Sequence, residues 1–253
     1  MTALAGLRAL VTGGGRGIGA ATAATLTAEG AEVTVLGRTA GSLQATVDRG
    51  EASACIVADV TDPHAYAAAL ERAGGAGRFD ILVNNAGGAT SAPFLRTTDE
   101  DFRAALDLNL MGAVHGARLV LPAMLERGFG RVVTVASTAG LKGYGYVSAY
   151  VAAKHAVVGF TRALALETAR RGVTVNAVCP GFTDTDLVAD SVARIVDKTG
   201  RSEDEARAEL AAANPQGRLV TPAEVAAAVL YLCRRDSGAI NGVALPVAGG
   251  EVG

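Results

Sequence analysis

Aromatic residues are scarce in this chain. They make up 4% of the 253 residues, and tryptophan is absent. Proteins that bind single-stranded nucleic acid stack bases on aromatic side chains, so this composition gives no support for such a partner. Charge of one sign is also lacking, because 23 Lys and Arg stand against 25 Asp and Glu, a formal net charge of −2. We therefore expect no nucleic acid and no membrane surface as a partner.

Cysteine is almost as rare. Cys55, Cys179 and Cys233 are far apart and form no Cys-x-x-Cys pair. This spacing argues against a disulfide framework and against a zinc site, so no metal is predicted and a reducing compartment is expected. We find neither an apolar run of about 18 residues that would cross a membrane nor a basic stretch followed by an apolar leader. These absences predict a soluble, cytoplasmic protein.

Hydrophobic residues, by contrast, make up half of the chain and recur in short runs. The runs predict strands that are covered on both faces: Leu7–Thr12, Ala31–Leu36, Ala54–Val57, Ile81–Asn84, Val132–Ser137, Val173–Cys179 and Ala244–Val247. Alanine-rich stretches with a 3.6-residue period predict helices between them: Ile18–Ala28, Pro63–Ala73, Asp99–Arg127, Ala149–Arg171 and Pro222–Cys233. This alternation predicts one α/β domain over residues 1–253, a doubly wound, seven-stranded parallel sheet with helices on both faces.

One long segment departs from the alternation. Residues 184–216 form a helix-prone insert after the sixth predicted strand, with amphipathic stretches at Asp190–Lys198 and Ser202–Ala213. Long connections at the carboxyl edge of a parallel sheet often close over a ligand. We therefore predict a helical substrate lid at residues 184–216.

Glycines cluster after the first predicted strand, in the run Thr12-Gly13-Gly14-Gly15-Arg16-Gly17-Ile18-Gly19. A tight turn that leads into a helix lets backbone N–H groups approach a pyrophosphate. The spacing fits T-G-x-x-x-G-x-G and not G-x-G-x-x-G. A flexible turn without a ligand is the alternative, but its place between a strand and a helix favours a Rossmann-type dinucleotide-binding fold.

The second predicted strand lacks an acid at its end, where the sequence reads Val35-Leu36-Gly37-Arg38-Thr39. An acid there would bind a ribose 2′-hydroxyl and repel a 2′-phosphate. Arg38 and Arg16 could instead clamp that phosphate, which favours NADP(H) and leaves NAD(H) possible. The alternative is a pair of solvated surface arginines. Asp59 is placed to bind the adenine amino group or to serve as a turn or N-cap acid.

A second group of polar residues follows in the middle of the chain. Tyr150 and Lys154 are four positions apart, so a helix places them on one face. A free phenol titrates near pH 10, and a nearby ammonium group would lower its pKa toward the range that acid–base catalysis needs. Ser137, 13 positions before Tyr150, could hold a carbonyl oxygen. Tyr150 and Lys154 alone are weak evidence for a catalytic site, but together with Ser137 and the glycine turn they are strong evidence.

Together these motifs resemble those of the short-chain dehydrogenase/reductase family, over essentially the whole chain. The matching segments, in order, are Thr12-Gly13-x-x-x-Gly17-x-Gly19, Asn84-Asn85-Ala86-Gly87, Asn109, Ser137, Tyr150-x-x-x-Lys154 and Pro180-Gly181. The chain is similar to the ketoacyl (acyl-carrier-protein) reductase, polyketide ketoreductase and 3-hydroxyacyl-CoA dehydrogenase branches. The stretch Asn176–Phe182 looks particularly like polyketide ketoreductases.

The resemblance implies a catalytic set of four residues. Tyr150 would be the general acid in carbonyl reduction and the base in alcohol oxidation. Lys154 would lower the pKa of Tyr150 and bind the nicotinamide ribose, and Ser137 would polarise the substrate oxygen. Asn109 would support a water-linked proton relay to Lys154, with a buried structural role as the alternative.

The resemblance also implies a set of cofactor-binding residues. They are Thr12, Gly13, Gly15, Arg16, Gly17, Ile18, Gly19, Arg38, Asp59, Val60, Asn85, Ala86, Gly87, Tyr150, Lys154, Pro180, Gly181, Thr183 and Thr185. For Thr185 the alternative is to cap the lid helix.

Four further residues have simpler interpretations. His155 follows Lys154 and so points away from the Tyr150–Lys154 face, and we expect it and His115 to be structural. Tyr144 and Tyr146 lie among glycines before Tyr150. They are expected either to wall the substrate or to pack under the lid.

The combined expectation is an NADP(H)-dependent enzyme that reduces a ketone to a secondary alcohol. The substrate would be a β-ketoacyl thioester or a polyketide or aromatic ketone, and related enzymes imply a homotetramer or homodimer. One alternative is an NAD(H)-linked catabolic alcohol or 3-hydroxyacyl-CoA dehydrogenase, which Arg16 and Arg38 disfavour. The other is a non-catalytic cofactor-binding scaffold subunit, which the complete catalytic set disfavours.

Overall fold

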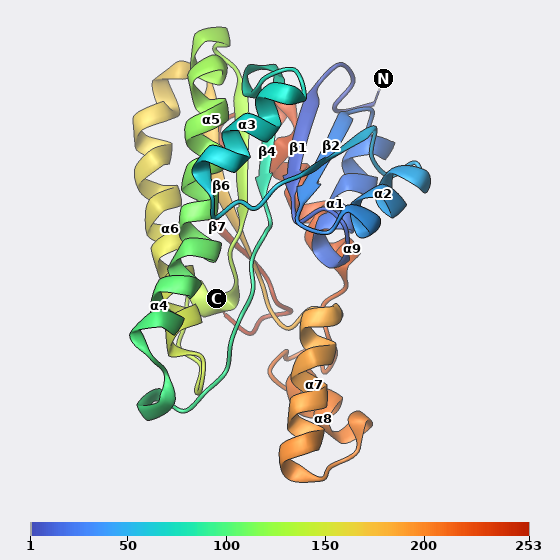
Figure 1. The fold of residues 1–253 in the computed structure, drawn as a ribbon, viewed down its shortest axis with the longest axis vertical. Helices are drawn as coiled ribbons and strands as arrows, with labels where there is room; N and C mark the ends of the chain where they lie inside the picture. The colour runs from blue at the N-terminus through green and yellow to red at the C-terminus, as the bar shows by residue number, and fades with distance from the viewer. Residues whose placement is uncertain (1, 253) are drawn as a thin grey trace.

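A parallel sheet forms the centre of the computed structural model, which describes residues 2–252 (Figure 1). Within these residues the sheet has seven strands in the order β3-β2-β1-β4-β5-β6-β7. The strands are β1 (Arg8–Thr12), β2 (Glu32–Gly37), β3 (Ala54–Val57), β4 (Ile81–Asn84), β5 (Gly130–Val135), β6 (Val173–Pro180) and β7 (Ala244–Val247). The predicted doubly wound α/β fold is confirmed, and each strand end lies within two residues of its predicted position.

Helices cover both faces of the sheet (Figure 1). One layer contains α1 (Gly17–Ala28), α2 (Ala40–Asp48) and α9 (Pro222–Cys233), which pack in one hydrophobic cluster against the β-strands. The opposite layer contains α3 (Pro63–Arg72), α5 (Gly112–Arg127) and α6 (Ser148–Thr168). Neighbouring strand residues serve opposite layers: Val11 joins the first cluster and Leu10 the second. This two-sided burial explains why the strands read as continuous apolar runs.

The sequence prediction missed α2. Of its nine residues only Leu43 and Thr46 are buried, so the helix carries too short an apolar stripe to give a periodic signal.

The predicted helix at Asp99–Arg127 is interrupted. It consists of α4 (Asp99–Leu106), a π-helical turn at Asp107–Met111 and α5. The Asn109 side chain donates to the carbonyl oxygen of Ala105 (2.9 Å), the acceptor that the Asn109 N–H would use in a regular α-helix. The side chain therefore competes for the backbone bond at the point where the helix widens.

The same helical stretch, Asp99–Arg127, is long and apolar enough to cross a membrane by length and composition alone, with a mean hydropathy of 1.3 over 18 residues. In this protein, however, its inner face is part of the core. Ala117, Val120 and Met124 are buried against the sheet, as in a core helix of a globular domain.

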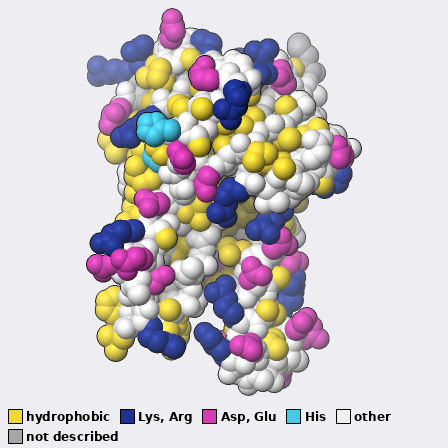
Figure 2. Space-filling view, viewed as in Figure 1, with side chains coloured by type: hydrophobic (Ala, Val, Ile, Leu, Met, Phe, Trp, Pro, Cys, Tyr) yellow, Lys and Arg dark blue, Asp and Glu magenta, His cyan; other side chains and the backbone are white. Residues whose placement is uncertain are grey.

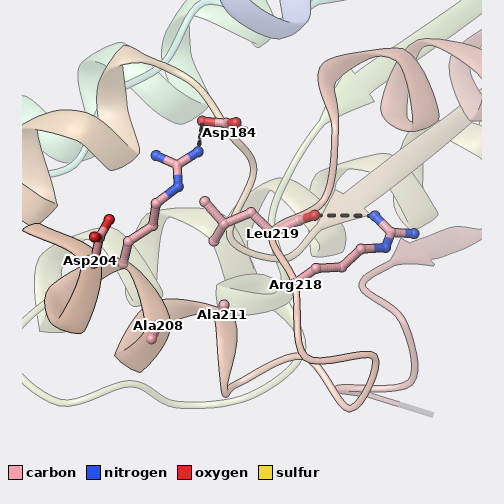
Figure 3. A pocket seen from close by; sticks show the side chains of 7 residues that line it. Asp184, Asp204, Ala208, Ala211, Arg218 and Leu219 are labelled. Carbon is pink, nitrogen blue, oxygen red and sulfur yellow. Dashed lines mark hydrogen bonds and ion pairs between the residues drawn. The ribbon is translucent and has the colours of Figure 1, made fainter.

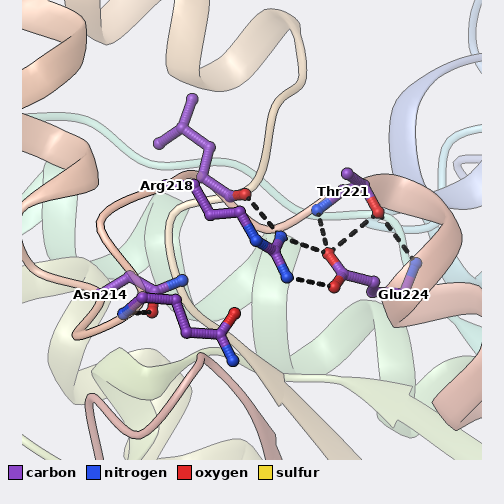
Figure 4. A network of polar contacts seen from close by, with 6 residues as sticks. Asn214, Arg218, Thr221 and Glu224 are labelled. Atoms are coloured by element: carbon purple, nitrogen blue, oxygen red, sulfur yellow. Dashed lines mark hydrogen bonds and ion pairs between the residues drawn. The ribbon is translucent and has the colours of Figure 1, made fainter.

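The predicted lid is helical and projects from one end of the molecule as α7 (Asp186–Thr199) and α8 (Glu203–Ala211) (Figure 1). It has a small core of its own, which contains Val188, Val192 and Ala206. The segment that returns from the lid is anchored by Arg218, which donates two hydrogen bonds to Glu224 (2.9 and 2.6 Å). Glu224 in turn closes the capping box of α9 with Thr221 (Figure 4).

The turn between α6 and β6 requires glycine. Gly172 has φ +72°, and a Cβ there would lie 2.1 Å from the carbonyl oxygen of Gly128. We expect Gly172→Ala to lower the free energy of unfolding by about 2–4 kcal/mol, because it adds a steric clash to an unfavourable backbone conformation. Urea denaturation of the purified protein measures the change.

Gly41→Ala is the matched control. Gly41 lies in α2, and its Cβ would meet no described atom within 4 Å. Alanine in a helix should leave stability unchanged or raise it by about 0.5–1 kcal/mol. Equal stabilities of the two variants would contradict this account of Gly172.

Candidate active site

The ends of β1 and β4 are joined by hydrogen bonds at the carboxyl edge of the sheet. The Thr12 hydroxyl accepts from the backbone N–H groups of Asn85 and Ala86, both at 3.0 Å. The Asn85 side chain donates to the carbonyl oxygens of Thr12 (3.0 Å) and Gly13 (3.2 Å). These bonds fix the glycine turn beside the loop after β4, where the strand order reverses and ligands of such sheets bind.

The glycine turn brings α1 close to β1. Gly17, the first residue of α1, has φ +52°, and a Cβ on Gly19 would lie 2.1 Å from the Gly13 carbonyl oxygen. Among the described residues, no side chain caps α1 and no acid lies in its first turn, whereas α4, α8 and α9 each carry a capping box. The first N–H groups of α1 are thus left for an anion, which fits a dinucleotide pyrophosphate.

Three other residues of the predicted cofactor set face protein instead of the expected ligand. A Cβ on Gly15 would lie 2.5 Å from the Ser42 hydroxyl of α2, so Gly15 permits close packing of two elements. The Ile18 side chain packs on the core, which leaves only its backbone to face a ligand. Val60 is buried against Gly112.

The two arginines of the predicted phosphate clamp are held apart by separate ion pairs. Arg16 lies 3.3 Å from Asp186 of the lid, and Arg38 lies 3.8 Å from Asp59. Both arginine side chains are about three-quarters exposed, at 76% and 73%. Exposed ion pairs of this kind contribute only about 0–1 kcal/mol, so either arginine can turn toward a phosphate at little cost.

Asp59 itself forms a turn. Its carboxylate accepts from both the N–H (2.9 Å) and the hydroxyl (2.8 Å) of Thr61. Burial acts to raise the pKa of Asp59, but these hydrogen bonds and the charge of Arg38 lower it below its usual value. The turn-acid alternative therefore describes the Asp59 side chain in this structure.

Ser137, Tyr150 and Lys154 come together as predicted. Ser137 follows β5, and its hydroxyl, which accepts from the N–H of Ala139 (3.1 Å), lies close enough to Tyr150 on α6 to lower the pKa of the phenol. Lys154 is 4% exposed, its Nζ lies 5.6 Å from the Tyr150 ring centroid, and it donates to the carbonyl oxygen of Val135 (2.9 Å). A β-strand end and a helix face thus place a hydroxyl, a phenol and an amine at one site.

The electrostatics of this group differ from the expectation. Burial raises the pKa of Tyr150, and the nearby Ser137 hydroxyl offsets only part of that effect. Burial also lowers the pKa of Lys154 to about 8. The net shift of the Tyr150 pKa in this ligand-free structure is therefore upward, opposite to the predicted lowering, and burial is its main cause.

Asn109 is buried, and its amide is fully used. Its Nδ2 donates to the carbonyl oxygens of Gly88 (3.0 Å) and Ala105, and its Oδ1 accepts from the Gly88 N–H (3.3 Å). A Cβ on Gly87 would lie 2.8 Å from the Asn109 Oδ1 and 3.5 Å from the Lys154 Nζ. Asn109 therefore holds the loop after β4 next to Lys154. In this structure its side chain has the buried structural position that was the alternative to a proton relay.

The segment after β6 completes the site from the C-terminal half of the chain. Pro180 ends β6, and the buried Thr183 donates to the carbonyl oxygen of Gly181 (3.0 Å). Thr185 takes the N-cap position of α7, but its hydroxyl donates to Thr183 (3.2 Å) instead of capping the helix. Its methyl group would lie 3.2 Å from a Cβ on Gly17, so this segment meets the glycine turn.

The residues expected to be structural have structural positions. His155 is exposed, with its Nδ1 2.9 Å from the carbonyl oxygen of Val151, and His115 hydrogen-bonds the carbonyl oxygen of Val60. Cys179 is buried, which raises the pKa of its thiol to about 11. Tyr144 packs edge-on against Phe182, whereas Tyr146 is 70% exposed.

Sequence reasoning missed one charged residue near this site. Glu251, two positions before the last residue, has a side chain that is 1% exposed and lies against Gly181. It belongs to none of the motifs above, and only its place beside two glycines could have drawn attention to it.

A cavity of about 390 Å³ lies apart from these residues, at the base of the lid (Figure 3). It is lined by Asp184, Asp204, Arg207, Ala208, Ala211, Arg218 and Leu219. Both arginines are paired with acids, Arg207 with Asp184 and Arg218 with Glu224. On the face drawn in Figure 2, Lys and Arg side chains are interspersed with Asp and Glu side chains.

Comparison with known proteins assigns this fold and site to a class. A family model described as short chain dehydrogenase matches residues 8–195. The chain therefore belongs to the short-chain dehydrogenase/reductase family and is an oxidoreductase of that family.

Three relatives illustrate the similarity. The 3-oxoacyl-[acyl-carrier-protein] reductase of Escherichia coli is 38% identical over 244 residues, with 96% of each chain covered. The D-beta-hydroxybutyrate dehydrogenase of Cupriavidus necator is 39% identical, over 98% of this chain and 99% of the relative. A crystal structure of an actinorhodin polyketide ketoreductase variant with NADPH is 40% identical, covers 97% of both chains and has a TM-score of 0.89.

The raised pKa of Tyr150 predicts a measurable titration. In the cofactor-free protein, Tyr150 should deprotonate above the usual range near pH 10, because its burial disfavours the phenolate. The difference in phenolate absorbance between the wild type and Tyr150→Phe isolates this one group. A phenolate step below that range would show that Lys154 dominates over desolvation.

Proposed function

We propose that the protein reduces a ketone to a secondary alcohol with NADPH. The observation that carries this proposal is the cluster of Ser137, Tyr150 and Lys154 beside the uncapped start of α1. The relatives support it, since they include a 3-oxoacyl reductase and a ketoreductase with NADPH.

The chain offers a complete set of groups for the cofactor. The N–H groups at the start of α1 bind the pyrophosphate, and Arg16 and Arg38 leave their exposed acid partners to bind the 2′-phosphate. Pro180, Gly181, Thr183 and Thr185 hold the nicotinamide end, and the loop of Asn85, Ala86 and Gly87 lines the path between. When bound, NADPH would supply the hydride for the carbonyl carbon.

Three side chains handle the substrate oxygen and its proton. Ser137 donates a hydrogen bond to the carbonyl oxygen, and Tyr150 transfers its phenolic proton to that oxygen as negative charge develops. Lys154 binds the nicotinamide ribose and stabilises the phenolate that remains. Asn109 holds the loop after β4 next to Lys154 and so supports the water-linked relay that returns a proton to Lys154. The raised pKa of Tyr150 keeps its phenol protonated at neutral pH in the cofactor-free protein, and a protonated phenol is the form that can donate in carbonyl reduction.

The substrate we propose is a β-ketoacyl thioester or a polyketide or aromatic ketone. A second candidate is NAD(H)-linked oxidation of a hydroxy acid, because one relative is a D-beta-hydroxybutyrate dehydrogenase. Gly37 and Arg38 at the end of β2 disfavour this NAD(H)-linked reaction. NAD-binding sites usually have an acid at this position, which hydrogen-bonds the ribose 2′-hydroxyl. The non-catalytic scaffold alternative conflicts with the assembled Ser137–Tyr150–Lys154 cluster.

We further propose a cytoplasmic homotetramer, with a homodimer as the smaller possibility. The α6 helix presents Leu166, which is 83% exposed, and small residues such as Gly159 leave its surface open to close packing. Related enzymes imply pairing through this helix and α5.

The central test of the proposed chemistry is Tyr150→Phe. This change removes the proton donor and keeps the ring, so turnover of a β-ketoacyl thioester should fall by at least about 100-fold, with NADPH affinity unchanged. NADPH consumption and fluorescence titration measure the two effects. Tyr231→Phe, on the exposed face of α9, is the matched control and should retain full activity. Substantial turnover by Tyr150→Phe would refute the assignment.

The cofactor preference depends on Arg38. Arg38→Asp should weaken NADPH binding by about 10- to 100-fold, since it replaces hydrogen bonds between charged groups with repulsion. NADH affinity should stay the same or rise, because the new acid can accept from the 2′-hydroxyl. Arg72→Asp, an equal charge change on the exposed end of α3, should alter neither constant. Equal affinity of the wild type for NADPH and NADH would contradict the phosphate assignment and favour the NAD(H)-linked candidate.

A further inference from the structure

A buried carboxylate from the C-terminal segment reaches the edge of the active site. The side chain of Glu251 is 1% exposed. Its Oε1 accepts a hydrogen bond from the hydroxyl of Tyr144 and lies 3.1 Å from the Nζ of Lys142. One oxygen of this carboxylate therefore has two partners, both from the loop between Ser137 and Tyr150.

The other oxygen is buried without a hydrogen-bond partner among residues 2–252. It lies 2.8 Å from the point where a Cβ on Gly181 would stand. Gly181 directly follows β6, in the segment to which we assign the nicotinamide end of the cofactor. Leaving a buried acceptor unpaired costs about 1–3 kcal/mol, and more for a charged group, so this position calls for a donor.

The surroundings of Glu251 connect it to the catalytic group. Tyr144 also hydrogen-bonds Thr138 (2.6 Å), the residue after Ser137, and its ring packs edge-on against Phe182 at 6.0 Å between centroids. Glu251 therefore bridges the loop that carries Ser137 and the segment that follows β6. A ketone held at Ser137 and Tyr150 would lie between these two segments.

The charge balance defines the kind of donor. Lys142 already neutralises the carboxylate at 3.1 Å, and its Nζ also lies 4.9 Å from the Tyr144 ring centroid. A second cation would therefore lack a counter-charge, whereas a neutral hydroxyl group can donate to the free oxygen without adding charge.

A purely structural role for Glu251 accounts for only half of these contacts. The bonds to Lys142 and Tyr144 would fasten the chain end to the loop, and they need only Oε1. With these two contacts made, the second oxygen of Glu251 is still buried, unpaired among residues 2–252 and next to Gly181. A structural role does not explain this oxygen.

We propose that Glu251 is a specificity-determining residue that accepts a hydrogen bond from a hydroxyl group of the substrate. The preferred ketones then carry a hydroxyl at a fixed distance from the reacting carbonyl. This inference rests on the proposed ketone reduction and adds the substrate class that the site selects. A site built to bond a hydroxyl rejects the analogue that lacks it, because its own polar group would be left unpaired.

The test compares ketones that differ only by a hydroxyl in place of a methyl group. The pairs are hydroxyacetone and 2-butanone, 4-hydroxy-2-butanone and 2-pentanone, 5-hydroxy-2-pentanone and 2-hexanone, and 6-hydroxy-2-hexanone and 2-heptanone. The wild type should show a kcat/KM ratio of about tenfold or more in favour of the hydroxy ketone in at least one pair. Glu251→Ala should reduce that ratio to about one, whatever its effect on the turnover of the plain ketone.

Tyr144→Phe separates recognition from fastening. It removes the hydrogen bond to Oε1 but retains the carboxylate, so the hydroxyl preference should persist whatever the effect on overall turnover. Retention of the preference in Glu251→Ala would by itself overturn the proposal.

A binding measurement keeps the inference separate from the chemistry. In Tyr150→Phe with NADPH bound, the hydroxy ketone of the selected pair should quench NADPH fluorescence at lower concentration than its partner, and adding Glu251→Ala should remove the difference. If no pair shows a difference in either assay, the hydroxyl role is wrong. Binding with discrimination but no wild-type turnover would refute the reductase proposal alone. Weaker NADPH binding by Glu251→Ala with an unchanged ketone ratio would assign the carboxylate to the nicotinamide amide and overturn the inference.

Discussion

The hydrogen bonds between the Thr12 hydroxyl and the backbone of Asn85 and Ala86 determine where this protein can bind a ligand. They join β1 to β4 at the point where the chain changes direction across the sheet. All strands are parallel, so every loop that follows a strand opens on the same edge. The glycine turn, the Ser137 loop and the segment after β6 meet there because of this one geometric constraint.

Desolvation is the second factor that shapes the site. Lys154 and Tyr150 are packed under the loop after β5, and burial moves the pKa of each toward its neutral form. A dinucleotide would bring phosphate charge to this edge and favour the ammonium form of Lys154. Charge and cofactor binding are therefore coupled, and the acid–base properties of Tyr150 belong to the complex more than to the free protein.

Much of the fold and the central part of the site follow from the sequence. Strands that are buried on both faces appear in the sequence as apolar runs. Tyr150 and Lys154 are four positions apart on one helix face, and Ser137 follows a strand, so their proximity could be predicted from their spacing. Other features depend on tertiary contacts that have no local pattern. The helix α2 buries too few apolar residues to be periodic, the π-turn at Asn109 depends on a loop bond to Gly88, and Arg16 meets Asp186 from the distant lid. Glu251 is buried because the segment after β7 lies against Gly181 and against the loop between Ser137 and Tyr150, which no spacing in the sequence predicts.

The most direct test of ketone reduction follows the transferred atom. The purified protein would be incubated with an acetoacetyl thioester and NADPH that carries deuterium on one face of the nicotinamide C4, and the alcohol product would be analysed by mass spectrometry and NMR. Our account predicts deuterium on the carbinol carbon from one labelled face and none from the other, since in the proposed complex the segment after β6 would hold the ring in a single orientation. An unlabelled alcohol from both cofactors, or no alcohol with NADPH left unconsumed, would contradict it.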